Sequence, residues 1–235
     1  MLSRLFQPYQ YSETALLLSF GNEINATTTQ DIRSVNEAIR NKPFPGFIET
    51  VPAYTSLTIF YDLIEITNSD LPGDDAREKI TRYLDTLEPA ETAHNQNKPV
   101  LIPVCYEGIY APDMKEVTRF LGLPAEDIIR LHSDAEYEVA MLGFMPGFPY
   151  LTGMDKRLII PRKDTPGKRV PGGSVGIAGV QTGIYPFAAP GGWQLIGRTP
   201  MQLFSLKQDP PALLAQGFKV KFAPISATEF ERLIS

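Results

Sequence analysis

Residues 170–179 read Val170-Pro-Gly-Gly-Ser-Val-Gly-Ile-Ala-Gly179, and this run lies in the segment, residues 142–200, that holds 12 of the 18 glycines of the chain. Glycine loses more backbone entropy on ordering than other residues, so this density indicates tight turns or a backbone that approaches something closely. Short β-compatible segments, punctuated by Gly or Pro, lie in and around the run at 139–144, 174–178, 193–196, 201–206 and 219–222. Many short strands separated by turns predict a closed β-barrel here.

The first 88 residues show a different pattern. Strands are predicted at 14–20, 48–51 and 57–61, where short apolar or β-branched runs are bounded by turn residues. Apolar residues recur with helical spacing after the first strand and after the third, at Ile32, Val35, Ile39, Ile80, Tyr83, Leu84 and Leu87. Strand, helix, strand, strand, helix is most of a split β-α-β-β-α-β unit. We therefore expect a small ferredoxin-like α/β domain at 1–88, although the sequence does not locate its last strand.

A second domain is expected at 99–235, which makes the fold class α+β. Residues 89–98 are polar and without periodicity, as in a linker. Ahead of the barrel segments we predict a strand at 100–106 and a short helix that turns Val117, Phe120 and Leu121 inward. A second helix is predicted from Pro124 and a last one at 228–234.

The composition narrows the class of protein. The net charge of −5 without long runs of like charge argues against a nucleic-acid binder. No stretch of eighteen apolar residues and no secretory leader is evident, so we expect neither a membrane span nor secretion. Cys105 is the one cysteine, which excludes an internal disulfide and a cysteine-based zinc cluster. These features predict a cytoplasmic protein.

A basic segment stands out in this acidic chain. Residues 155–170 carry six cations against Asp155 and Asp164, and the cations are Lys156, Arg157, Arg162, Lys163, Lys168 and Arg169. The segment is either a solvated loop or a site for a small carboxylate or phosphate, for which Arg offers a bidentate fork. The glycine run has neither the Rossmann spacing nor a P-loop ending, so no classical nucleotide site is expected.

Two residues are candidates for proton transfer. His132 is predicted near the C-terminus of a helix, where the helix dipole would favour its charged form, although a structural cap explains its position as well. Ser174 lies between glycines but lacks the Gly-x-Ser-x-Gly context of a hydrolase nucleophile. Cys105 is expected to be a buried, inert thiol. No His, Asp or Glu cluster has metal-ligand spacing, so we predict no metal held by this chain alone.

Several consecutive motifs closely resemble one known family. They are Leu142-Gly-Phe-Met-Pro-Gly-Phe-Pro-Tyr-Leu151, Val170-Pro-Gly-Gly-Ser-Val-Gly-Ile-Ala-Gly179, Gln181-Thr-Gly-Ile-Tyr-Pro186 and Pro190-Gly-Gly-Trp-Gln-Leu-Ile-Gly-Arg-Thr-Pro200. With Ile102-Pro-Val-Cys-Tyr106 and Val51-Pro-Ala-Tyr-Thr-Ser-Leu57 they resemble the KipI/PxpB family of 5-oxoprolinase subunits. One departure is Thr165-Pro166-Gly167, where many relatives read Thr-Pro-Arg, and loss of that arginine weakens any claim for one specific anion contact.

The resemblance implies a cyclophilin-like β-barrel at the C-terminus and kinship with the first half of the carboxyltransferase domain of urea carboxylase. It implies a non-autonomous component of an ATP-dependent enzyme that opens 5-oxoproline to L-glutamate, with a PxpC-like protein as direct partner and a PxpA-like protein as the third component. This chain alone would bind no cofactor, and the assembled complex would use ATP with Mg. Two alternatives stay open: a non-catalytic KipI-type inhibitor that docks on a sporulation histidine kinase, and a carboxyltransferase-type component related to urea carboxylase.

Under the enzyme interpretation we expect the basic segment to bind a small anionic substrate next to glycine backbone amides. Substrate-binding candidates are Arg162, Lys168, Arg169, Gly172, Gly173, Gln181 and Tyr185, with Ser174 and His132 as candidate catalytic groups. Phe148, Tyr150 and Trp193 would wall the crevice, or alternatively belong to the barrel core.

Overall fold

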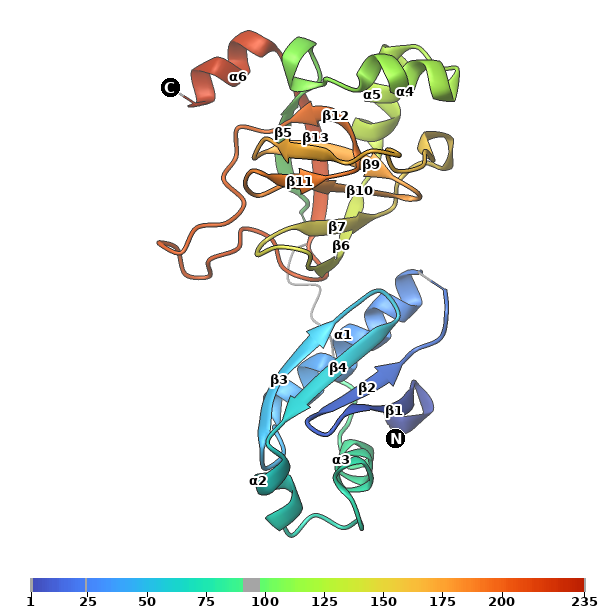
Figure 1. The fold of residues 1–235 in the computed structure, drawn as a ribbon, viewed down its shortest axis with the longest axis vertical. Helices are drawn as coiled ribbons and strands as arrows, with labels where there is room; N and C mark the ends of the chain where they lie inside the picture. The colour runs from blue at the N-terminus through green and yellow to red at the C-terminus, as the bar shows by residue number, and fades with distance from the viewer. Residues whose placement is uncertain (1, 24, 91–97, 235) are drawn as a thin grey trace. The chain divides into compact units, whose positions relative to one another are not determined.

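The computed structural model describes residues 2–23, 25–90 and 98–234 (Figure 1). The chain divides into two compact units, Met1–Asn95 and Gln96–Ser235. Most of the predicted linker, including His94, lies outside the described residues, so the predicted domain boundaries at 88 and 99 stay predictions. Among the described residues, no helix is both long enough and apolar enough to cross a membrane.

The N-terminal unit is a four-stranded sheet in the order β1-β2-β4-β3, with every neighbouring pair antiparallel. Its elements are η1 (Leu2–Arg4), β1 (Gln7–Ser12), β2 (Ala15–Ser19), α1 (Ala26–Asn41), β3 (Phe47–Pro52), β4 (Ser56–Tyr61), α2 (Leu63–Asn68) and α3 (Ala76–Asp85). β2 and β3 are parallel and have β4 between them, so α1 crosses over one strand. This arrangement places α1 against one face of the sheet (Figure 1).

Alternating residues of the central strands form the core of this unit. Leu18 lies opposite Leu57 in the register of β2 and β4, and both are fully buried beneath the apolar stripe of α1. The helix starts are capped by side chains: Asn25 accepts a hydrogen bond from the Thr28 amide at 2.9 Å, and Asp75 accepts one from the Glu78 amide at 2.7 Å. Both helices also show the apolar spacing predicted from the sequence, α1 after the first predicted strand and α3 after the third.

The ferredoxin-like prediction is not confirmed in the form expected. Among the described residues of this unit no strand follows α3, and the edge position beside β2 is taken by β1, which precedes β2 in the chain. β1 has no counterpart among the predicted strands because five of its six residues are exposed, so it shows no alternation of apolar and polar residues.

The C-terminal unit confirms the closed barrel. Seven strands pair in the order β10-β7-β6-β13-β5-β12-β9, and β9 pairs with β10 to close it. They are β5 (Val100–Cys105), β6 (Tyr137–Leu142), β7 (Pro149–Thr152), β9 (Ser174–Ala178), β10 (Gln181–Ile184), β12 (Gln194–Arg198) and β13 (Lys219–Ile225). A separate ribbon pairs β8 (Gly167–Val170) with β11 (Ala189–Gly191). β13 and β5 are parallel and the other strand pairs are antiparallel.

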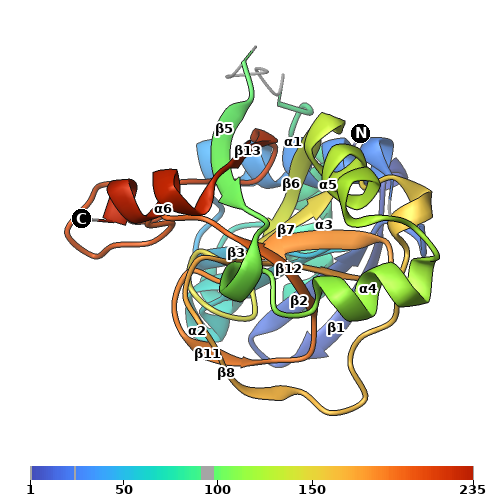
Figure 2. The same cartoon turned by 90° about the horizontal axis from the view of Figure 1, so that it is seen from above.

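Helices pack around one part of the barrel: α6 lies on one side of β5 and β13, and α4 and α5 lie on the other (Figures 1 and 2). They are η2 (Gly108–Tyr110), α4 (Met114–Leu121), α5 (Ala125–Asp134), η3 (Lys156–Leu158) and α6 (Ala227–Ile234). Gly122 ends α4 in the left-handed conformation, which glycine adopts at little steric cost. Two expectations are wrong: Phe120 is 61% exposed rather than turned inward, and no strand forms at 201–206, where Phe204 makes one isolated bridge to Ala212.

Candidate functional site

One pocket of the C-terminal unit is lined by several aromatic rings and one arginine. It has a volume of about 220 Å³ and lies beside the ribbon of β8 and β11. Its lining residues are Phe144, Phe148, Tyr150, Arg162, Pro166, Tyr185, Pro190, Gly191, Gly192 and Trp193. The structure thus brings together Arg162, Tyr185 and the three predicted wall residues, which come from segments far apart in the chain.

The walls of the pocket are rings held edge to face. Phe148 is almost fully buried and lies 5.2 Å from Tyr185 and 5.5 Å from Trp193, centroid to centroid, at nearly perpendicular angles. Tyr150, on β7, adds a contact with Trp193 at 5.8 Å. Such edge-to-face pairs are favourable beyond their buried area. The rings therefore belong both to a small core cluster and to the pocket wall, so the two alternatives weighed for them coexist.

Glycine makes this packing possible at one point. A Cβ atom on Gly191 would lie 2.3 Å from the Tyr185 hydroxyl oxygen, so no larger residue fits there while that ring stays in place. The glycine density of the segment therefore reflects close packing of this wall as well as turns.

Arg162 is exposed, but the backbone on both sides of it is tied down. The Lys163 amide donates to the Gly192 carbonyl at 2.7 Å, and the Gln194 side chain donates to the Pro161 carbonyl at 3.2 Å. The Lys163 ammonium pairs with Asp113, which also accepts the Leu195 amide at 2.6 Å. These contacts anchor the loop beside β12 and fix the backbone on both sides of Arg162.

The two tyrosine hydroxyls of the pocket stay protonated. Burial raises the pKa of Tyr150, and the positive charge of Arg162 only partly opposes this effect. Burial likewise raises the pKa of Tyr185, while a backbone hydrogen bond from Trp193 and the charge of Arg162 oppose it. The Tyr185 hydroxyl therefore keeps a proton beside the cationic guanidinium.

Phe144 was not singled out from the sequence, yet it lies at the rim of the pocket. Its φ is +69°, and it is the one non-glycine residue with positive φ among the described residues. Its ring is 63% exposed and contacts Phe148 at 5.7 Å. Residues held in strained backbone conformations cluster at ligand sites. Its neighbours Gly143 and Pro146 marked a turn, but no local pattern distinguishes this conformation.

Other predicted substrate-binding residues lie outside the pocket lining. Lys168 and Arg169 are exposed neighbours on β8, and successive strand residues point to opposite faces of the ribbon. Gln181 begins β10 and is half-buried. The Gly173 amide donates to the Tyr185 carbonyl at 2.7 Å, and the Gly172 carbonyl accepts from Arg198 at 2.8 Å. The Gly173 amide, expected to face an anion, is thus used within the fold.

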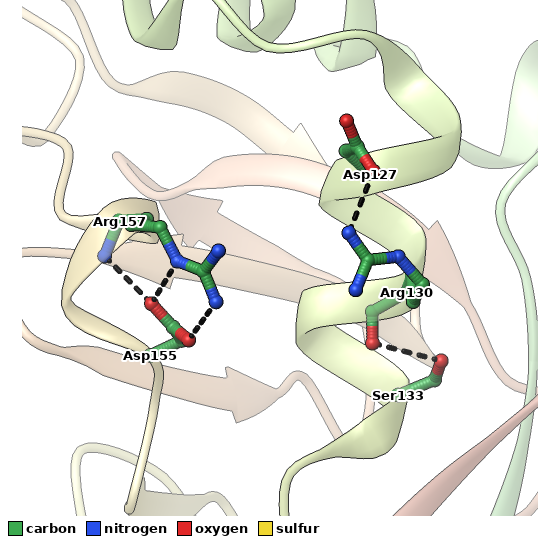
Figure 3. Close-up of polar contacts among 5 residues, drawn as sticks. All are labelled: Asp127, Arg130, Ser133, Asp155 and Arg157. Atoms are coloured by element: carbon green, nitrogen blue, oxygen red, sulfur yellow. Dashed lines mark hydrogen bonds and ion pairs between the residues drawn. The ribbon is translucent and has the colours of Figure 1, made fainter.

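Part of the basic segment is paired away from the pocket. Figure 3 shows Arg157 of η3 bound to Asp155 and, on α5, Arg130 bound to Asp127. Arg157 contacts both carboxylate oxygens of Asp155, at 3.0 and 2.7 Å, and lowers the pKa of that carboxyl to about 2. Lys163 is paired with Asp113, and Arg162 is the cation of the segment that lines the pocket.

His132 and Ser174 are not brought together as a catalytic pair. The His132 ring is fully buried and bonds Tyr106 Oη at 2.8 Å and Thr182 Oγ1 at 2.9 Å. Because the Thr182 hydroxyl donates to the Gly176 carbonyl, it accepts from Nε2–H, and Nδ1 accepts from Tyr106. Burial lowers the pKa of His132 to about 3, so the expectation of a charged histidine at the helix end is wrong.

Ser174 is 4% exposed at the start of β9 and does not line the pocket. Cys105 is buried, as expected. Within the described part of the chain, no three His, Cys, Asp or Glu side chains lie together as metal ligands would. The expectation that this chain alone holds no metal stays a prediction.

Comparison with known proteins finds one matching family model and several similar proteins that share one description. The family model of the carboxyltransferase domain, subdomains C and D, matches residues 6–214. A 5-oxoprolinase subunit of Bacillus subtilis is 44% identical over 230 residues, 96% of this chain and 95% of that protein. Its counterpart in Escherichia coli O157:H7 is 38% identical over 92% of this chain and 94% of that protein.

Solved structures also resemble this one, and two of them are described here by their similarity. The crystal structure of TTHA0988 has a TM-score of 0.78 and 35% identity over 91% of this chain, but only 40% of that chain, so the present chain spans about two fifths of its length. The K. lactis urea amidolyase has a TM-score of 0.77 over 97% of this chain and 15% of that one, at 19% identity, which shows a shared fold alone.

Proposed function

The chain belongs to the family of carboxyltransferase domains described as subdomains C and D, and from this premise we propose that it is the PxpB-type component of an ATP-dependent 5-oxoprolinase. In this proposal it opens 5-oxoproline to L-glutamate together with PxpA-like and PxpC-like proteins in the cytoplasm. The observation that carries the proposal is its end-to-end similarity to the 5-oxoprolinase subunit of B. subtilis. The pocket beside Arg162 supports it, because the pocket suits a small anion.

In this proposal the role of this chain in the reaction is to bind and orient the substrate. A lactam is stabilised by amide resonance, so its opening at neutral pH needs activation, which ATP supplies when it is bound by the assembly. Arg162 would hold the substrate carboxylate, and the Tyr185 hydroxyl would donate to an oxygen atom on which negative charge develops. The aromatic walls would exclude water from the ring.

Partner proteins would complete the site. The pocket lining contributes one cation and two tyrosine hydroxyls but no carboxylate or imidazole that could act as a general base. The match to TTHA0988 covers 40% of that chain, and a separate protein would supply the corresponding remainder here. A PxpC-like protein is the proposed direct partner.

The experiment is 5-oxoproline-dependent ATP hydrolysis by this chain mixed with its PxpC-like and PxpA-like partners, with each protein omitted in turn. We expect the activity to disappear when this chain alone is left out. A stable complex without activity would overturn the proposal. ATP hydrolysis that requires bicarbonate and a urea derivative would then indicate a carboxyltransferase, and inhibition of a histidine kinase would indicate a regulator.

A further inference from the structure

The N-terminal unit carries an apolar groove beside α2, which we call the α2 groove. It has a volume of about 360 Å³ and is lined by Thr14, Ile48 and residues 60–64. Ile48 and Ile64 are 61% and 73% exposed, and Leu63 is exposed beside them. Large apolar side chains that gather at one exposed groove are typical of a surface that another molecule covers.

The short helix α2, which forms one side of the groove, is held at both ends. At its start, Asp62 accepts hydrogen bonds from two backbone amides of the helix, both at 2.9 Å. At its end, the Lys79 ammonium of α3 donates to three backbone carbonyls, at 3.3, 2.8 and 2.8 Å. A helix of six residues is marginal by itself, so these contacts fix Leu63 and Ile64 at the surface before any ligand arrives.

The charges around the α2 groove all have one sign. The lining residues and their immediate neighbours in the chain, at 13–15, 47–49 and 59–65, include four exposed carboxylates and no Lys or Arg. The four are Glu13, Glu49, Asp62 and Glu65. Within the described part of the chain, none of them forms an ion pair with a Lys or Arg side chain. The groove is therefore apolar with an acidic border.

This border decides between the possible occupants. A second copy of this chain in a two-fold contact would bring two acidic borders together, and an anionic membrane surface would also meet like charge. Addition of a strand does not suit the groove, because β4, which carries Phe60 and Tyr61, is already paired on both sides. What the groove offers is a depression for apolar side chains, as in the binding of an amphipathic helix.

We propose that the α2 groove binds an amphipathic helix of a partner protein, with an apolar stripe flanked by Lys or Arg. The stripe would cover Ile48, Leu63 and Ile64, and the flanking cations would lie against the acidic border. The groove belongs to the other unit from the pocket of Arg162, and the proposal does not rest on the proposed function.

The test uses designed helical peptides of about 18 residues and the full chain. One peptide has Leu along a single helical face and Lys elsewhere, the second has Glu in place of Lys, and the third has the Leu and Lys order scrambled. Fluorescence anisotropy of the labelled peptides measures binding. We expect the Leu/Lys peptide to bind at least about tenfold more tightly than the other two, and added salt to weaken its binding.

Variants decide whether the α2 groove is responsible. Ile64→Ala should weaken binding of the Leu/Lys peptide about tenfold, because it removes apolar surface that the peptide would cover. The matched control is Ile109→Ala, at an isoleucine of the barrel unit that is 85% exposed, and it should leave binding unchanged. Glu49→Lys should weaken binding of the Leu/Lys peptide and strengthen that of the Leu/Glu peptide. All three positions are exposed, so unchanged thermal unfolding should show that the variants fold.

Three results would overturn the proposal. They are equal binding of the Leu/Lys and Leu/Glu peptides, unchanged binding by Ile64→Ala, and sedimentation that shows a dimer of this chain that Ile64→Ala dissociates. The third result would assign the groove to a second copy. Each of these outcomes would leave the proposed 5-oxoprolinase function standing, because that function is tested by ATP hydrolysis in the assembled complex.

Discussion

Two of the groups of aromatic rings in the barrel unit, one around His132 and one around Trp193, differ in what surrounds their polar atoms. Around His132, the hydroxyls of Tyr106 and Thr182 bond to the imidazole, and Tyr137 donates to the His132 carbonyl, all in the buried interior. Around Trp193, the side chains of Tyr150 and Arg162 line a pocket. We conclude that the first group serves stability, since its polar atoms bond one another in the buried interior, and that the second is suited to a ligand, since it lines a pocket.

The largest expected effect on stability concerns the buried group around His132. His132→Ala removes a ring stacked 4.4 Å from Phe222 and leaves the Tyr106 and Thr182 hydroxyls without their partner. We expect a loss of about 3 to 5 kcal/mol in the free energy of unfolding, measured by urea denaturation. The adjacent Ser133→Ala removes one long hydrogen bond, 3.4 Å to the Arg130 carbonyl, and should cost less than about 1 kcal/mol.

A small stability loss for His132→Ala, together with loss of activity in the assembled complex, would reverse the assignment. His132 would then take part in the reaction rather than stabilise the fold.

The same group predicts a pH dependence. Burial lowers the pKa of His132 from 6.5 to about 3, so between these values the unfolded chain binds a proton that the folded chain does not. Stability should therefore fall as the pH drops below about 6.5, by about 1.4 kcal/mol per pH unit, until the pH approaches 3. Between pH 6.5 and pH 5 the wild-type chain should lose about 1.6 kcal/mol more than His132→Gln, because the unfolded histidine is half protonated at pH 6.5. Parallel curves would contradict the assignment of His132 as a buried neutral ring.

An intermediate effect is expected at the wall of the pocket. Gly191→Ala places a methyl group against the Tyr185 hydroxyl and should cost about 1 to 3 kcal/mol while it weakens ligand binding. Gly167→Ala is the matched control, because Gly167 does not line the pocket and the nearest neighbours of an added Cβ lie at 3.5 Å or more. Thermal unfolding and Trp193 fluorescence titration of the two variants test this difference. Equal behaviour would mean that the wall is loose and that the pocket is not preformed.

The smallest effect on stability is expected for the anchor of Arg162. Asp113→Asn removes the ion pair with Lys163 but keeps an oxygen for the Leu195 amide, so the free energy of unfolding should change by less than about 1 kcal/mol. Binding of 5-oxoproline should still weaken about threefold to tenfold, because the loop of Arg162 loses one attachment. Urea denaturation and calorimetric titration measure the two quantities. Unchanged binding would show that the backbone contacts of Lys163 suffice.

Local patterns determined the elements that show a clear period. The helical spacing of Ile32, Val35 and Ile39 appears as α1, because an apolar period reports which face of an element is buried. The glycine-rich segment forms part of a closed barrel, because glycine and proline mark the turns between its short strands. Exposed elements were missed for the same reason, as β1 shows. Phe120 was misplaced because the helical period alone does not reveal where the neighbouring layer ends.

What the sequence by itself determined is the fold type of the barrel, the resemblance to one family and a small set of candidates that already held Arg162, Tyr185 and Trp193. Only the tertiary structure decided which cation of the basic segment lines the pocket and whether His132 is buried or accessible to solvent. Both depend on contacts between segments far apart in the chain, such as Lys163 with Asp113 and His132 with Thr182. A residue's charge and role follow from the burial and partners that these contacts create, and no local pattern contains that information.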